Sequence, residues 1–197
     1  VLFALALLAS ASTQDHWAVL VAGSNKYWNY RHQADVCHAY HIIKKSGIPE
    51  EQIIVLAYDD IANNKQNPIQ GKIFNKKNGA DVYEGCKIDY RESDVTPEKF
   101  LQVLSGTADG KSLQTDENSK VFVYFSDHGA PGLIAFPSNE LYAKDFHETI
   151  LSMHKEKKYG EMVIYIEACE SGSMFEGLLE EDINVYATTA ANPTESS

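Results

Sequence analysis

Residues 162–172, M-V-I-Y-I-E-A-C-E-S-G, form the stretch from which the fold can be predicted. Its first five residues are apolar or aromatic without alternation, which is typical of a short strand buried on both faces of a parallel sheet. Glu167, Cys169 and Glu170 follow at the point where that strand is expected to end. The carboxyl end of a strand in an open α/β sheet is where ligands and reactive groups usually lie. Cys169 is therefore a candidate nucleophile.

The rest of the chain alternates between strand-like and helix-like segments. Such alternation predicts an α/β fold with a mainly parallel central sheet. Thr96 and Pro97 are typical of a helix N-cap and first turn, and Gly106 of a helix end. The expected strands are residues 16–23, 53–57, 120–125, 162–168 and a fifth opening at 184–187, and the expected helices are 33–46, 97–105 and 142–154. A short hairpin arm is expected at 133–136.

Residues 61–94 interrupt this alternation. They are rich in Asn, Lys, Gly and Asp, a composition that predicts loops and turns. We expect a long surface excursion, with short hairpins around Ile73 and Phe74 and around Val82 and Tyr83.

The chain length and charge restrict the classes of function. A chain of 197 residues is expected to form about one domain with a substantial core. The formal net charge is −11, whereas nucleic-acid and anionic-membrane surfaces need basic patches. The sequence therefore argues against nucleic acid as a partner.

The first twelve residues, V-L-F-A-L-A-L-L-A-S-A-S, resemble the apolar region of a secretory signal peptide. They include an A-x-A-like cleavage site at residues 9–11 and are too short to span a bilayer. We expect residues 1–12 to be a signal-peptide remnant and residues 13–197 to be one domain without stable membrane insertion. The alternative is a buried first strand or helix.

The chain has three cysteines, too few for a disulfide framework. No C-x-x-C pair occurs, so neither a structural zinc site nor any other metal or cofactor is expected. Cys37 is predicted to be a small core residue of its helix. Cys86 has no evident partner, and Cys169 is expected to be free.

Polar clusters follow three of the predicted strands, at residues 24–32, 126–129 and 167–172. Because parallel strands end at the same edge of a sheet, these clusters can converge. The imidazole of His128 could then take the proton of the Cys169 thiol and return it to a leaving amine. The alternative is that Cys169 is a small buried residue and that His128 and Gly129 form an ordinary turn.

Acyl transfer through a thioester also needs hydrogen-bond donors for the oxyanion. The backbone N–H groups of Gly129 and Cys169 are the candidates. A further side-chain oxygen should orient the imidazole. The residues alone leave Asn25, Asn29 and Asp127 eligible.

Several longer motifs resemble those of the legumain family, the asparaginyl endopeptidases of the caspase-like clan. The motifs are Y-I-E-A-C-E-S-G-S-M from Tyr165, D-H-G from Asp127, N-Y-R-H-Q-A-D from Asn29, D-V-T-P from Asp94 and N-V-Y-A-T-T-A-A-N-P from Asn184. The resemblance implies a caspase-like three-layer fold with helices flanking a mainly parallel sheet. The family's last strand, an acidic pocket residue and a C-terminal prodomain would lie beyond Ser197, so a partial sequence is expected.

The resemblance also implies roles for individual residues. Cys169 would be the nucleophile, His128 the acid and base, and Asn29 the residue that orients the imidazole. A pocket for a substrate asparagine would be built from Arg31, His32, Glu167 and the backbone of Ser196. An amide offers one acceptor oxygen and one donor NH2, which Arg31 and Glu167 can match. A plain ion pair between Arg31 and Glu167 is compatible with this reading.

The implied activity is hydrolysis of peptide bonds after Asn, and more weakly after Asp at acid pH, with ligation as a side activity. The implied partners are peptides and proteins with Asn at the cleaved position and cystatin-type inhibitors, and the implied location is a lysosome, a vacuole or the exterior. The chain has Lys26, Tyr27 and Trp28 where the family usually has Gly-Trp-Tyr. The alternatives are the catalytic subunit of a GPI-anchor transamidase and a non-catalytic scaffold homologue.

Overall fold

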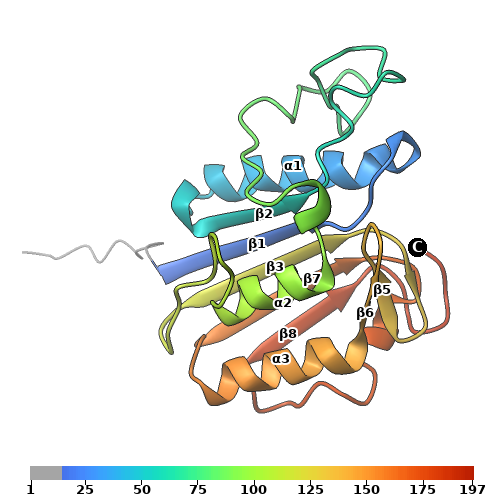
Figure 1. Cartoon of the computed structure of the whole chain (residues 1–197). Helices are drawn as coiled ribbons and strands as arrows, with labels where there is room; N and C mark the ends of the chain where they lie inside the picture. Colours follow the sequence, from blue (N-terminus) through green and yellow to red (C-terminus); the bar gives the residue numbers. More distant parts are fainter. Residues whose placement is uncertain (1–14) are drawn as a thin grey trace, which may run out of the picture.

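A computed structural model describes residues 15–197, and the expected signal-peptide remnant lies outside the described residues. Five parallel strands form the central sheet in the order β2-β1-β3-β7-β8 (Figure 1). The predicted parallel α/β sheet is therefore confirmed. Its strands are β1 (His16–Ala22), β2 (Ile53–Ala57), β3 (Lys120–Ser126), β7 (Glu161–Glu167) and β8 (Val185–Thr189).

Helices cover both faces of this sheet, which gives three layers (Figure 1). Alternate residues of β1 face opposite layers: Leu20 packs in the cluster that includes Tyr40 of α1 (Tyr30–Lys45), whereas Val21 packs in the cluster of α2 (Pro97–Ser105) and α3 (Ala143–Lys155). Burial of each such aliphatic side chain contributes roughly 1.5–3 kcal/mol. Burial on both faces explains the continuous apolar runs of β1 and β2. The same prediction is wrong for β7, in which Ile164 and Ile166 are buried but Tyr165 is 43% exposed.

The residues predicted to begin and end α2 do so in the structure. The hydroxyl of Thr96 accepts a hydrogen bond from the Lys99 N–H at 3.1 Å, and Pro97 occupies the first turn. Gly106 ends the helix in the left-handed conformation, with φ of 73°. No helix within residues 15–197 is long and apolar enough to cross a bilayer.

A second, antiparallel sheet of three short strands follows directly after β3. The hairpin expected at 133–136 is one part of it. The strands are β4 (Gly129–Ala130), β5 (Leu133–Ala135) and β6 (Glu140–Tyr142), in the order β4-β5-β6. This small sheet fixes the direction in which the chain leaves His128.

The excursion at residues 61–94 packs against α1 more closely than its composition indicates (Figure 1). The two positions expected to form separate hairpins pair with each other instead: Val82 N–H donates to the Ile73 carbonyl, and Phe74 forms a bridge with Asp81. Ile73 and Val82 are buried beside Ala34 of α1. The excursion therefore contributes its own small hydrophobic cluster.

Cys37 is buried in the core, as predicted, but the expectation that Cys86 has no partner is wrong. Cys37 of α1 and Cys86 of the excursion form a disulfide, with Cα atoms 5.5 Å apart. The two cysteines are 49 residues apart in the sequence and meet because the excursion folds back onto α1. The spacing of the cysteines in the sequence does not predict this pairing. Cys169 is free, as expected.

Candidate active site

The polar clusters meet at the carboxyl edge of the sheet. Ala22 of β1 pairs with Ser126 of β3, and Ser126 pairs with Glu167 of β7. The Asp127 N–H continues this ladder by donating to the Glu167 carbonyl at 3.1 Å. His128 and Cys169 each lie two residues beyond the last pair, so the register brings both to the same level of the edge.

Gly129 packs directly against the backbone of Cys169. A Cβ atom at Gly129 would lie 2.3 Å from the Cys169 carbonyl oxygen and 3.1 Å from the Ala168 Cβ. Such a contact cannot be relieved by turning a flexible side chain, because the oxygen belongs to the backbone. The glycine after His128 therefore allows the ends of β3 and β7 to approach closely.

Asn29 is the residue that contacts the His128 ring. His128 Nε2 lies 2.9 Å from Asn29 Oδ1, and Asn29 Nδ2 donates to the Asn25 carbonyl at 3.0 Å. The second bond orients the amide, so that its oxygen faces the imidazole. Because a carbonyl oxygen only accepts, Nε2 carries the proton and Nδ1 of neutral His128 keeps its lone pair. Of the three eligible orienting residues, Asn29 makes this contact.

Asp60 holds the turn that carries Asn29. Asp60 lies just after β2, and one carboxylate oxygen accepts from the Lys26 N–H at 2.6 Å while the other accepts from Gln33 Nε2 at 2.9 Å. These bonds join the turn before α1 to its second helical turn. Lys26 has φ of 70°, a conformation that is costly for a residue with a side chain. Sequence reasoning missed this role, although an Asp after a buried strand was visible.

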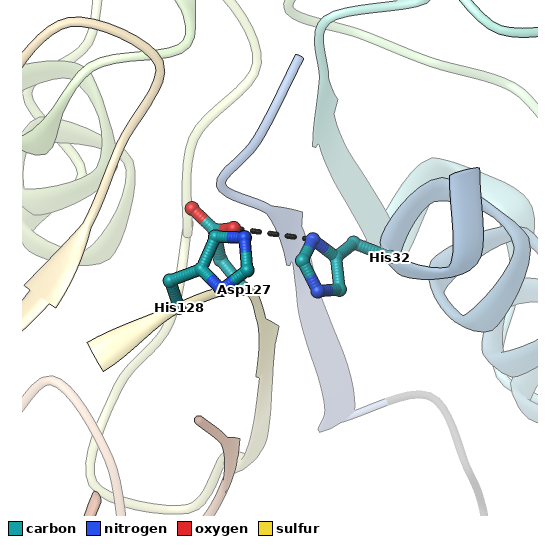
Figure 2. Close-up of side chains that lie close together, drawn as sticks. All are labelled: His32, Asp127 and His128. Atoms are coloured by element: carbon teal, nitrogen blue, oxygen red, sulfur yellow. Dashed lines mark ion pairs between the residues drawn. The ribbon is translucent and has the colours of Figure 1, made fainter. Parts of the chain in front are cut away.

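His32 points inward rather than toward solvent. Only 3% of its surface is exposed, and its Nδ1 lies 2.7 Å from the Ser24 hydroxyl and 3.1 Å from Asp127 Oδ1 (Figure 2). Successive residues of a helix are about 100° apart, so exposed Arg31 and buried His32 face different ways. The structure thus places His32 behind the site surface, next to Asp127.

The Cys169 thiol is poised for ionisation by its surroundings. The backbone N–H of Ser197 lowers the pKa of Cys169 most, opposed by desolvation, and the side chains of Ser197 and Ser196 lower it further. Hydrogen bonds of this kind favour the thiolate. The Glu170 N–H donates to the Glu195 carbonyl at 2.8 Å, which holds the final segment beside the thiol.

Arg31 and Glu167 do not form an ion pair with each other within residues 15–197. Arg31 lines a cavity of about 620 Å³ between α1 and the excursion, and none of the other predicted site residues lines it. Glu167 lies near Tyr124, whose pKa is raised by burial first and then by the negative charges of Asp35 and Glu167. Both side chains are exposed.

Comparison with known proteins agrees with this geometry. The model of the peptidase C13 family matches residues 16–197. The chain belongs to this family. Similar relatives include the hemoglobinase of Schistosoma japonicum, 58% identical over 183 residues, and the legumain of Homo sapiens, 56% identical over 189 residues; each match covers 92% of this chain and 43% of the relative. The vacuolar-processing enzyme delta-isozyme of Arabidopsis thaliana is 55% identical over 92% of this chain and 40% of its own length. The chain thus spans about two fifths of the length of these relatives.

Proposed function

We propose that this C13-family chain carries the catalytic machinery of a cysteine endopeptidase that hydrolyses peptide bonds after Asn, and more weakly after Asp at acid pH. The observation that carries the proposal is the hydrogen bond from His128 Nε2 to Asn29 Oδ1 at the edge where Cys169 lies. It leaves a lone pair on His128 Nδ1, at the same edge of the sheet as a thiol whose pKa is lowered.

In the first half of the reaction, the Cys169 sulfur attacks the carbonyl carbon of the substrate Asn. His128 Nδ1 takes the thiol proton and passes it to the departing amine nitrogen as the C–N bond breaks. The N–H groups of Gly129 and Cys169 stabilise the oxyanion of the tetrahedral intermediate. The products are a free amine and a thioester on Cys169.

In the second half, water attacks the thioester carbonyl. His128 removes a proton from the water and returns it to the departing sulfur, which releases the carboxylic acid and restores the thiol. When a peptide amine attacks in place of water, the same steps form a new peptide bond. Ligation is therefore a side activity of the same thioester.

Recognition of the substrate Asn requires one donor and one acceptor. Arg31 donates to the side-chain carbonyl oxygen and Glu167 accepts from the NH2 group, with the Ser196 backbone alongside. The absence of an Arg31–Glu167 ion pair among the described residues leaves both groups available. His32 supports the pocket from behind through its contacts with Ser24 and Asp127.

The names of the relatives support a proposal for the location of the protein. One is named a vacuolar-processing enzyme and others are named hemoglobinase or legumain. We infer that this protein acts on peptides and proteins in a lysosome-like or vacuole-like compartment, where cystatin-type inhibitors would be its regulators.

The test is cleavage of four fluorogenic peptides that differ only in having Asn, Asp, Arg or Lys before the reporter. We expect turnover of the Asn peptide, weaker turnover of the Asp peptide at acid pH, and no activity in a Cys169→Ala variant. Turnover of the Arg or Lys peptide would contradict the pocket while leaving the thiol chemistry intact. Activity that persists in Cys169→Ala would contradict the nucleophile.

A further inference from the structure

Three potential metal ligands lie together at the candidate active site, two of them buried and one exposed. His32 comes from α1, and Asp127 and His128 follow β3 (Figure 2). Their ligand atoms all lie within 4.8 Å of one another, and the two imidazole rings meet edge to face with centroids 5.1 Å apart. The group contains no cysteine, so the spacing of cysteines in the sequence does not reveal it.

One atom of this group lacks a hydrogen-bond partner. Asp127 Oδ1 is buried and receives no hydrogen bond, although His32 Nδ1 lies 3.1 Å away. The same His32 nitrogen is already engaged by the Ser24 hydroxyl at 2.7 Å. A buried carboxylate oxygen without a donor is costly, because it has lost its water and gained no replacement. A bound cation would satisfy it.

We propose that His32, Asp127 and His128 form a binding site for a zinc ion. Zinc in sites with an open position takes three protein ligands from imidazole and carboxylate groups, with water as the fourth. Ligands about 2.0–2.2 Å from a tetrahedral zinc lie roughly 3.3–3.6 Å apart. The 3.1 Å between His32 Nδ1 and Asp127 Oδ1 is slightly shorter than this separation, so a small displacement of the two side chains would admit the ion.

His128 completes the site by a small movement. It is exposed, so its ring can move toward the other two ligands, whereas His32 and Asp127 are buried and fixed. Its Nε2, which Figure 2 shows on the side of the Asp127 carboxylate and His32, is bonded to Asn29 Oδ1. Nε2 is therefore the nitrogen that faces the ion, and coordination requires this hydrogen bond to break. Coordination through His32 Nδ1 also requires the Ser24 hydroxyl to turn away.

The bound ion would inhibit the peptidase. This consequence rests on the proposed function, because it assigns Nδ1 of His128 as the base that takes the thiol proton. A neutral imidazole that binds an ion through Nε2 carries its proton on Nδ1, so the ion removes the lone pair of the base without contacting Cys169. The site is thus a metal-dependent off switch assembled around the catalytic histidine.

Binding is tested in the Cys169→Ala variant, so that the thiol cannot serve as a ligand. Calorimetric titration with zinc chloride should show one equivalent bound. The Asp127→Asn and His128→Gln substitutions in this background should each weaken binding at least tenfold. The control is His147→Gln, which removes the imidazole of another His–carboxylate pair, 2.9 Å from Glu180, and should leave binding unchanged.

Thermal unfolding of each variant shows whether it is folded. If Asp127→Asn fails to fold, His128→Gln still tests the site, because His128 is exposed and its replacement is not expected to disturb the core. Cobalt substitution should give a spectrum without a thiolate charge-transfer band in the wild-type protein. Absence of zinc binding, or binding that survives both substitutions, would overturn the proposal. So would binding that disappears with Cys169.

Inhibition is tested separately with the Asn peptide and wild-type protein. Zinc should abolish turnover over the concentration range in which it binds, and a chelator should restore it. Zinc binding without inhibition would support the metal site but contradict the role of His128 as the catalytic base. The experiments therefore distinguish failure of the proposed metal site from failure of the proposed function.

Discussion

Asn29 and His128 are separated by 99 residues, yet their side chains are joined by a 2.9 Å hydrogen bond. The Asn25 carbonyl fixes the Asn29 amide from the other side. We expect Asn29→Ala to lower kcat by roughly 10²-fold, near the lower end of what a positioned base contributes, with little change in KM. The loss follows because the imidazole is then free to rotate and to change tautomer. Steady-state kinetics with the Asn peptide measure both constants.

Asn25→Ala is the matched control for this prediction. Asn25 takes part through its backbone carbonyl, which the substitution retains. Activity within about twofold of wild type is expected. An equal loss in both variants would mean that the whole turn is disturbed, and would remove the argument for the Asn29 side chain.

The Cys169 thiol should titrate below its ordinary pKa of about 8.5. The Ser197 N–H is the strongest cause of the lowered pKa, so it stabilises the thiolate as the pH falls. The rate of iodoacetamide alkylation, followed against pH, should have its midpoint below that of a free cysteine peptide. Ser197→Pro, which removes the N–H, should move the midpoint upward by more than Ser197→Ala does. A midpoint that neither substitution moves would contradict the assigned cause.

Strands β1 and β2 were predictable because burial on both faces leaves a continuous apolar run. The bounds predicted for β2 were those found, and Thr96 and Gly106 marked the ends of α2 through local chemistry. The start of α1 was predicted at Gln33 but lies at Tyr30. The difference arises because Asp60, from beyond another strand, holds the polar turn that leads into the helix.

The candidate site was predictable in part. His128, Cys169 and Asn29 follow or precede buried elements, and parallel pairing necessarily brings strand ends together. The inward position of His32 was not predictable from composition, because it depends on the rotation of α1 against the sheet. The disulfide depends on the path of the excursion between Cys37 and Cys86, which no local signal encodes.

Asp60 should act as a positioning residue for the site. Asp60→Ala removes the acceptors of the Lys26 N–H and the buried Gln33 amide, and we expect a loss of roughly 1–3 kcal/mol in the free energy of unfolding. It should also lower kcat with KM nearly unchanged, because the turn that carries Asn29 is released. Urea denaturation and steady-state kinetics measure the two effects.

Asp109→Ala provides the comparison for Asp60. The Asp109 side chain is 86% exposed and pairs with Lys99, so its loss should cost little and leave kcat unchanged. If Asp60→Ala lowers the stability without lowering kcat, Asp60 has only a structural role and the proposed effect on catalysis is wrong.

The Cys37–Cys86 disulfide should stabilise the fold by restricting the unfolded chain. It joins residues 49 apart in the sequence, and bridges of this span typically contribute roughly 2–4 kcal/mol. We expect Cys37→Ala/Cys86→Ala, made in the Cys169→Ala background to prevent intermolecular bonds, to lower the free energy of unfolding by this amount. A reductant should destabilise the single Cys169→Ala variant to a similar extent and leave the triple variant unchanged. Because the bridge ties the excursion to α1, hydrogen exchange should increase most at residues 61–94. Insensitivity of the single variant to reductant would show that the bridge makes no contribution to stability.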